Sequence, residues 1–600
     1  MKYVNRTYLL LAAVFIFSFT FFIVFPLAKL GTSHLRVIEA INTDESDLLW
    51  LIIQAFRNGT FDLGSSPYGI LYYNICLGLS YVLSWFTHVN DTHIIIITRL
   101  VSYTALLGSS ALIAKYVQHF KLGNWLVVFF LSLAGSLTLI RYGLMLHPDI
   151  LQLFFISGGL FCVSFYLEND KLKWFFLSVV CAGLAFSSKY SGLILLPLIV
   201  ISVLLKYNRV KDKLPIKASI LINLLGSTLV FIVIQLFEQT SFIVYINSVA
   251  WLAFVLLAGK IVSALVFIFH ISALFNKKLI EKDWFSLVAF LITLSFLVGT
   301  LFFITFSIAA PQGMVNLQFF TSFLTMTGDH VDGHWFRNDT GFIGWIQALV
   351  NARVVKPLWL VLFILGFSLL LKKNFQNKSS WFNPHLLPSY WIFTYLLVIT
   401  FGVSSKFEHY LIPVIPFFFI YIAYLISSLT DYVSKRVGWL TNSNMGLGIS
   451  LLFGCTLLIQ SFSYKNKKIE SFESSSRIAA GNWLDENVIE DVFILADKYT
   501  YVPARAHFHY TAYWGISTAL IEEFNPDYIV IQNDVYTSFL DSSRVNEYLH
   551  GRELFLDRSR LYNDLLSNSH STYELAKDFK KTKVYKRKYT RKENDPYVTN

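Results

Sequence analysis

The sequence predicts a polytopic α-helical membrane protein, with about thirteen transmembrane helices followed by an extracytoplasmic α/β domain. Of its 600 residues, 55% are hydrophobic and only 14% are charged, whereas ordinary soluble proteins carry roughly 25% charged residues. Long apolar runs alternate with short polar breaks up to residue 462. Charged residues make up about 28% of residues 463–600, against about 10% of those before. We therefore predict a membrane module over residues 1–462 and a soluble domain over residues 463–600.

The first apolar run, Thr7–Leu30, is long enough to cross a hydrocarbon core of about 30 Å. It lacks the short apolar region and the small-residue cleavage site of a signal peptide, so we expect a retained helix with a cytoplasmic N-terminus. Further spans are expected at residues 94–116, 124–142, 150–167, 172–188, 190–206, 218–237, 243–274, 285–308, 356–371, 388–403, 409–429 and 445–462.

The charges of the loops orient these spans. Basic breaks such as Lys206–Lys217 belong on the cytoplasmic side, whereas the acidic segment Gly31–Ser66 belongs outside. Every basic loop falls inside only if Pro67–Phe86 lies along or dips into the outer leaflet. Thirteen spans then place the C-terminal domain and the loops 31–93 and 309–355 outside the membrane.

The C-terminal domain is predicted to be α/β. Arg477–Glu486 has helical spacing, and two short apolar segments, Asp491–Ala496 and Asp527–Ile531, have the pattern of buried strands. Lys577–Lys592 carries nine basic residues. That run is interpreted as a solvated strand or disordered end, with contact to anionic lipid or polysaccharide as the alternative.

An acidic cluster in the first outer loop is the leading catalytic candidate. Asp44, Glu45 and Asp47 lie about a dozen residues after the first span. Neighbouring carboxylates raise the pKa of at least one of them, which suits a general base or a metal site. The alternative is a solvated loop or a helix N-terminus that favours acids.

Other polar residues stand where a membrane makes them costly. Tyr68 and Tyr72 suit an interfacial belt or a substrate groove. Arg141, His147 and Asp149 lie at the outer end of the third span, where Asp149 has the alternative role of capping a helix.

Two expected outer hairpins add further cations. Lys189 lies in one, and Lys406 and His409 lie in the other. Each lysine either reaches lipid phosphates by snorkelling or joins Arg141 in binding a phosphate-linked substrate. His330 and His334 lie in the loop 309–355, which is too long for a simple connector.

The sequence contains no motif for several classes of chemistry. The four cysteines lie in apolar stretches without a CxxC pair, and there is no Walker loop, GxGxxG, GxSxG or HExxH motif. We predict no cofactor and no metal, and no nucleic-acid partner.

The order of the motifs resembles the GT-C glycosyltransferases that use polyprenyl-phosphate sugars, and in particular family 39, the protein O-mannosyltransferases and aminoarabinose (lipid A) transferases. Nearly the whole chain takes part in this resemblance. The matching features are Asp44-Glu45, Pro67–Tyr73, His147-Pro148-Asp149, Lys189–Leu193, Lys406–Pro413 and the C-terminal Asn525–Tyr528.

The resemblance implies an inverting sugar transfer from an undecaprenyl or dolichyl phosphate to an extracytoplasmic lipid, glycan or protein, by an enzyme of the cell membrane. Asp44 maps onto the family's catalytic aspartate, and Glu45 would orient it or a donor hydroxyl. The expected phosphate ligands are Lys189, Lys406, His409 and Arg141, and His330 or His334 would lie over the acceptor.

The sequence also departs from the family. Aminoarabinose transferases carry a lysine where this chain has Ser66, and no segment is long enough for the β-trefoil domain of many mannosyltransferases. Two other hypotheses remain open: a transporter or lipid flippase, and a non-catalytic relative whose C-terminal domain binds cell-envelope glycan. The predicted cluster of charges at one membrane face and the absence of internal repeats favour the enzyme over the transporter.

Overall fold

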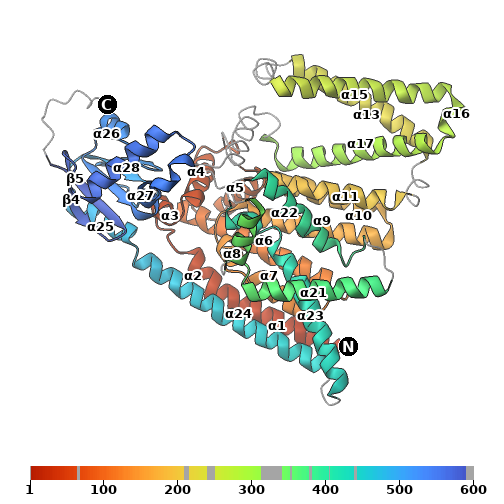
Figure 1. Ribbon diagram of the computed structural model, residues 1–600, viewed down its shortest axis with the longest axis horizontal. Coiled ribbons are helices and arrows are strands. Elements are labelled where there is room, and N and C mark those ends of the chain that lie inside the picture. The colour runs from red at the N-terminus through yellow and green to blue at the C-terminus, as the bar shows by residue number, and fades with distance from the viewer. Residues whose placement is uncertain are drawn as a thin grey trace.

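The computed structural model describes residues 2–63, 68–207, 215–239, 250–312, 341–351, 354–377, 382–403, 406–437 and 442–588, and for Thr43 and Asp44 it describes the backbone only. Helices form the described part of the chain up to Asn487, and a small sheet with its own helices follows (Figure 1). His330 and His334 lie outside the described residues.

The membrane module consists of α1 (Lys2–Phe19), η1 (Thr20–Val24), α2 (Phe25–Ala28), α3 (Leu35–Ile41), α4 (Thr43–Arg57), α5 (Leu71–Ser84), α6 (Asp91–His119), α7 (Trp125–Ala134), α8 (Leu137–Tyr142), α9 (Pro148–Asn169), α10 (Leu172–Ser188), η2 (Tyr190–Ile194), α11 (Leu195–Leu204), α13 (Ile216–Gln239), α15 (Ala250–Phe275), α16 (Lys277–Ile280), α17 (Asp283–Ala309), α20 (Gly341–Val350), α21 (Pro357–Gln376), α22 (Leu387–Gly402), η4 (Glu408–Leu411), α23 (Ile415–Arg436) and α24 (Asn442–Glu473).

Over the described ranges, nine helices are long and apolar enough to cross a membrane. The protein is thus a multi-pass helical membrane protein, but the thirteen continuous helices predicted from sequence are not confirmed. The expected span 124–142 is divided into α7 and α8, because Ser136 adopts an extended backbone. The expected span 190–206 begins as the 3₁₀ turn η2 before α11. α5 has 14 residues, about 21 Å at 1.5 Å per residue, and is shorter than the hydrocarbon core.

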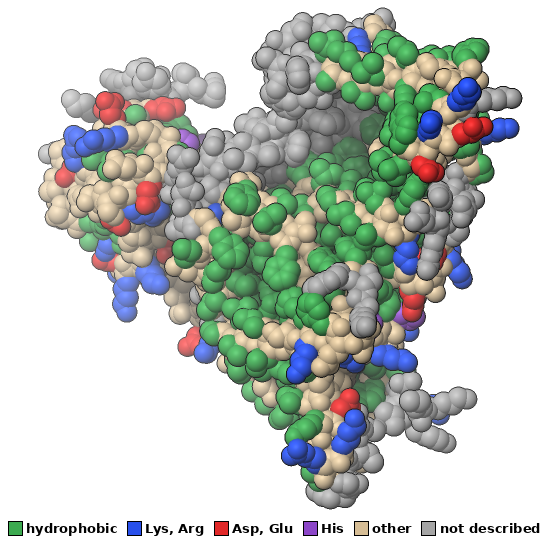
Figure 2. Space-filling view, turned by 45° about the vertical axis from the view of Figure 1, so that its right-hand side comes forward, with side chains coloured by type: hydrophobic (Ala, Val, Ile, Leu, Met, Phe, Trp, Pro, Cys, Tyr) green, Lys and Arg blue, Asp and Glu red, His purple; other side chains and the backbone are tan. Residues whose placement is uncertain are grey.

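Most of the helices surround one large apolar core, and α13, α15 and α17 also share a small apolar cluster of their own. In Figure 1, α1 and α24 run side by side along one edge toward the C-terminal domain, whereas α13, α15 and α17 form a layer at the opposite end. Figure 2 shows a broad apolar surface over the helices, with most of the charged side chains beyond it. Such a surface suits contact with lipid.

The C-terminal domain has a five-stranded sheet in the order β2-β1-β3-β5-β4. β1, β2 and β3 are parallel, whereas β5 pairs antiparallel with both β3 and β4. The predicted helix and both predicted strands are present. The elements are α25 (Ser476–Asn487), β1 (Val492–Asp497), β2 (Phe508–Tyr513), α26 (Thr518–Phe524), β3 (Tyr528–Gln532), α27 (Asn533–Leu540), η5 (Ser542–Asn546), α28 (Arg552–Leu566), β4 (Tyr573–Asp578) and β5 (Thr582–Arg587).

The C-terminal domain contacts the membrane module through α3. Arg36 Nη1 donates to the carbonyl of Pro503 at 2.8 Å, and its guanidinium lies 4.8 Å from the ring centre of Tyr510. The hydroxyl of Tyr510 donates to Glu39 Oε2 at 2.7 Å, and burial nevertheless raises the pKa of Glu39. Arg477 Nη1 donates to the carbonyl of Ala40 at 2.6 Å. These contacts hold α3, and α3 leads directly into the start of α4.

Candidate active site

The start of α4 is held by a buried ion pair. Arg99 of α6 faces Glu45 in two-pronged geometry, with Nε–Oε1 2.9 Å and Nη2–Oε2 3.1 Å. The two residues are 4% and 3% exposed, so the pair is shielded from water. Arg99 Nη1 also donates to the carbonyls of Ala28 and Leu30 after the first helix, and the backbone N–H of Leu146 donates to Glu45 Oε1. Four segments therefore meet at Glu45, next to Asp44 in the chain.

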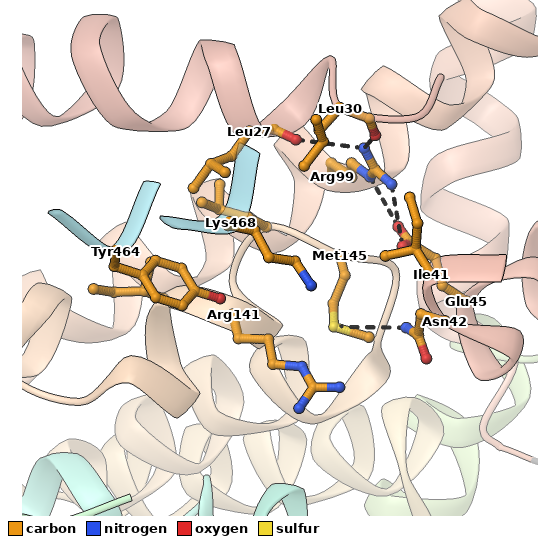
Figure 3. A pocket seen from close by; sticks show the side chains of 12 residues that line it. Leu27, Leu30, Ile41, Asn42, Glu45, Arg99, Arg141, Met145, Tyr464 and Lys468 are labelled. Carbon is orange, nitrogen blue, oxygen red and sulfur yellow. Dashed lines mark hydrogen bonds and ion pairs between the residues drawn. The ribbon is translucent and has the colours of Figure 1, made fainter. Parts of the chain in front are cut away.

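A pocket opens beside this ion pair (Figure 3). Asn42 and Glu45, which flank Asp44 in the sequence, line one wall. The side chains of Arg141 and Lys468 extend into it from the opposite side, next to Tyr464. A second cavity, lined by Arg141, Lys467, Lys468 and Glu408 among others, continues from the first. We call these two cavities together the basic pocket. Opposite the Glu45–Arg99 pair, its lining has three cations, Arg141, Lys467 and Lys468, and one carboxylate, that of Glu408.

The position of Arg141 is set by Glu408. Arg141 Nη1 donates to Glu408 Oε1 at 2.8 Å, and Thr138 Oγ1 donates to Glu408 Oε2 at 3.0 Å. The Arg141 side chain is still 38% exposed. Unlike Arg99, it therefore retains donors that can reach a ligand in the pocket.

A second polar group, the Asp149 cluster, is made of Tyr68, His147, Asp149, Lys189 and His409. Lys189 Nζ lies 2.8 and 2.9 Å from the two carboxylate oxygens of Asp149, and the His147 ring contacts the same carboxylate. The ring of His409 packs 5.0 Å from that of His147. Lys189 lies 5.3 Å from the ring centre of Tyr68. The cluster brings together residues that are distant in the sequence, such as Asp149 and His409.

The charges of this cluster largely cancel within it. Asp149 is fully buried and Lys189 is 6% exposed. A buried cation is stabilised by a buried carboxylate only when the pair is closely matched, and tyrosine ring faces add cation–π attraction. Lys189 is thus committed to Asp149 in this structure, whereas Arg141 and Lys468 face an open pocket.

Two glycines allow the close packing that places Lys189. A Cβ on Gly69 would lie 2.0 Å from the carbonyl oxygen of Ser187, and a Cβ on Gly192 would lie 2.4 Å from the backbone of Ala185. Only glycine fits where two backbones approach this closely. The Lys-x-x-Gly motif of the sequence therefore forms the tight turn after α10.

Other residues singled out in the sequence lie elsewhere. Tyr72 is fully buried, and its hydroxyl donates to the carbonyl of Thr98 at 2.6 Å, which joins α5 to α6. Lys406 Nζ donates to the carbonyl of Val403 and lies 5.1 Å from the ring centre of Trp345. Neither residue lines the basic pocket.

The sequence motifs did not point to Arg99 or Lys468. Arg99 is the one charged residue within the apolar run 94–114, and such a residue in a span signals a partner or a function. Lys468 follows the last apolar run by six positions, in the Lys-rich stretch 465–468. Its place in the pocket depends on α24 continuing as a helix to Glu473.

The sequence matches a known family over part of its length. Residues 76–235 match the family model described as dolichyl-phosphate-mannose-protein mannosyltransferase. This segment contains Arg99, Arg141, Asp149 and Lys189 but not Asp44. The match confirms, for this segment, the family resemblance inferred from the motifs. No curated protein sequence matches the chain.

Solved structures with some likeness to the chain include the oligosaccharyltransferase AglB from Archaeoglobus fulgidus in complex with an inhibitory peptide and a dolichol-phosphate. It has a TM-score of 0.45 and 12% identity, over 91% of this chain and 78% of that chain. ArnT from Cupriavidus metallidurans bound to undecaprenyl phosphate has a TM-score of 0.39 and 11% identity, over 96% of this chain and 97% of that chain. The apo state of the same ArnT has a TM-score of 0.38 and 12% identity, over 90% of this chain and 92% of that chain.

Proposed function

We propose that this protein is an inverting glycosyltransferase of the cell membrane, which transfers a sugar from a polyprenyl phosphate to an acceptor hydroxyl on the extracytoplasmic side. The observation that carries the proposal is the basic pocket: Arg141 and Lys468 face the start of α4, which bears Asp44 (Figure 3). The family match over residues 76–235 supports a lipid-phosphate-linked donor.

The chemistry requires a base on one side of the anomeric carbon and positive charge on the other. The Asp44 carboxylate removes the proton of the acceptor hydroxyl, while the acceptor oxygen attacks the anomeric carbon and inverts it. The bond between that carbon and the phosphate oxygen breaks, and the lipid phosphodiester leaves as a monoester. Arg141 and Lys468 stabilise the developing negative charge on this phosphate. Because the leaving group is a stable anion, the proposed step needs neither a general acid nor a metal.

Glu45 and Arg99 have a positioning role in this mechanism. Their buried pair fixes the first turn of α4 against α6 and the end of the first helix. A base works only within hydrogen-bond reach of the proton that it removes. The Glu45–Arg99 pair would therefore set the activity of Asp44 through the position of α4.

The experiment compares wild type with Asp44→Asn in membranes that contain the full chain and radiolabelled undecaprenyl-phosphate sugars. Transfer of label from lipid to acceptor should fall at least ~100-fold in the variant, in line with the loss of a general base. Asp62→Asn, an exposed carboxylate of the same outer loop, serves as the matched control and should retain wild-type transfer. Gel filtration in detergent shows whether each variant is folded.

The outcomes separate the three hypotheses. Near-normal transfer by folded Asp44→Asn would remove Asp44 from the catalytic role. A folded wild type that transfers label from no donor would favour the transporter or the non-catalytic glycan-binding relative. The latter would tolerate Asp44→Asn but fail in envelope binding when the C-terminal domain is removed.

A further inference from the structure

A third and larger cavity lies between the C-terminal domain and the membrane module. It has a volume of about 450 Å³, and we call it the junction groove. One side is formed by the end of α24 and the start of α25. The other side is formed by the end of β3, the start of α27 and the turn between β4 and β5. The groove thus exists only because the domain docks on α3 and α24.

The junction groove is continuous with the basic pocket. Lys468 lines all three cavities. Ile41 lines the groove and the first cavity of the basic pocket, and Ser471 lines the groove and the second cavity of the basic pocket. A molecule that reaches the start of α4 can therefore extend along the groove without leaving the protein surface.

The lining is basic and rich in hydroxyls. Lys468, Arg477, Lys580 and Lys581 contribute four cations, and Asp534 is the one carboxylate among the lining residues. Arg477 and Asp534 are paired with each other. The ammonium groups of Lys580 and Lys581, by contrast, make no hydrogen bond or ion pair with any residue that the structure describes. Both lysines are exposed and lie in a turn whose backbone is fixed by Asp578 and Phe579.

The groove also has the surfaces that recognise sugar rings. Serines at positions 471 and 474–476 line it together with Phe472 and Phe579. Ligand sites typically combine aromatic faces with a few polar groups that fix orientation. Part of the groove lies at the carboxyl end of the parallel strand β3, the edge at which open α/β sheets commonly bind ligands.

The position of the groove along α24 favours a water-soluble ligand over a lipid headgroup. The apolar part of α24 ends at Phe462. At 1.5 Å per residue, Glu473 lies about 17 Å further along the helix. The headgroup region adds only about 5–7 Å to each side of the hydrocarbon core. Lys580 and Lys581 belong to the C-terminal domain, which follows Glu473 in the chain, and they line the same groove as Arg477 and Asp534.

We infer that the junction groove binds the acceptor, and that the acceptor is an anionic glycan whose negative groups are recognised by Lys580 and Lys581. The inference rests on the proposed function, since it assigns the acceptor of the same site. The glycan lies along the groove with one hydroxyl at the start of α4, and Lys468 lies where the donor and acceptor sites meet.

The test measures binding of fluorescent glycans to the purified full chain in detergent. The probes are dextrans of equal length that are neutral, carboxymethylated or phosphorylated. Both anionic dextrans should bind, and the neutral dextran should bind at least ~10-fold more weakly, as expected for charge-assisted contacts. The double variant Lys580→Gln/Lys581→Gln should lose this preference. The matched variant Lys577→Gln/Lys586→Gln, on β4 and β5 but outside the groove, should keep it.

Three results would overturn the inference: equal affinity for neutral and anionic dextran, an equal loss in both double variants, or no loss in either. Displacement of the anionic dextran by phosphatidylglycerol micelles at the same phosphate concentration would instead identify a headgroup site and also refute it. The Asp44→Asn variant separates the two proposals, because it should bind anionic dextran as wild type does while transferring no sugar. Normal transfer by that variant would refute the proposed mechanism and leave the binding result standing.

Discussion

The ammonium group of Lys189 lies 2.8 and 2.9 Å from the two carboxylate oxygens of Asp149, in an interior where Asp149 is fully buried. The family resemblance implied a phosphate contact for Lys189, with snorkelling to lipid as the alternative, and a helix N-terminus was the alternative role for Asp149. The structure pairs the two side chains, and Asp149 lies in the first turn of α9.

Removing one partner of this pair should destabilise the protein strongly. Asp149→Asn leaves the Lys189 charge buried between the rings of Tyr68 and Tyr410, and breaking such a pair costs about 3–5 kcal/mol. The expected result is a clear drop in the apparent melting temperature, measured by fluorescence-detected gel filtration in detergent. The apparent melting temperature of Lys189→Met should fall by a similar amount. A stable Lys189→Met with a raised KM for the lipid donor would instead show that Lys189 binds the phosphate.

The Glu45–Arg99 pair should control catalysis through position. Glu45→Gln keeps the shape of the side chain but removes its charge, so the start of α4 is held less firmly. As a result, kcat should fall about 10-fold, with little change in the KM for the donor. Arg57→Gln is the control, since Arg57 forms an exposed pair with Asp91 that is worth at most ~1 kcal/mol. A change in KM alone would place Glu45 in donor binding.

Arg141 and Lys468 should act on the donor. Each substitution to Gln removes a cation from the basic pocket, and kcat/KM for the polyprenyl-phosphate sugar should fall about 10-fold or more, because hydrogen bonds to charged groups contribute about 1.5–3 kcal/mol. Lys465→Gln is the matched control, because Lys465 lies against the ring of Phe462 on the same helix and does not line the pocket. Equal effects at positions 465 and 468 would indicate a general surface effect.

The stability of the C-terminal domain should depend on Asp497. Burial raises the pKa of this carboxyl to about 7, although Tyr562 and the backbone N–H of Gln532 both donate hydrogen bonds to it. Because the folded pKa lies above the unfolded value, its stabilising contribution is complete below about pH 4 and is lost as pH rises through 7. The difference amounts to about 4 kcal/mol at most.

Thermal unfolding of the full chain, followed by tryptophan fluorescence from pH 5 to 8, measures this loss. Wild type should become less stable with rising pH, and Asp497→Asn should flatten the profile. A profile with the same slope in both proteins would assign the pH dependence to other groups.

The main elements of the fold follow from local sequence. Apolar runs of about 20 residues predict spanning helices because the bilayer fixes their length, and α6, α9, α13 and α17 lie close to the predicted ranges. The strands β1 and β3 follow from short apolar segments. The sequence predicted a hairpin around Lys189, and the 3₁₀ turn Tyr190–Ile194 lies there. The break at Ser136 was not predicted: Gly135 and Ser136 interrupt a largely apolar run, and packing against neighbouring helices decides whether the helix continues.

The candidate site divides in the same way. The sequence by itself determined which residues are chemically out of place: the acids at 44 and 45, Arg141, and Lys189 after α10. Only the tertiary structure decided their partners, because Glu45 and Arg99 are 54 positions apart and Arg141 and Glu408 are 267 apart. A charge in an apolar environment must find an opposite charge nearby in space, and residue spacing carries no record of which one. The fold therefore commits Lys189 to Asp149 and leaves Arg141, with Lys468, facing the pocket.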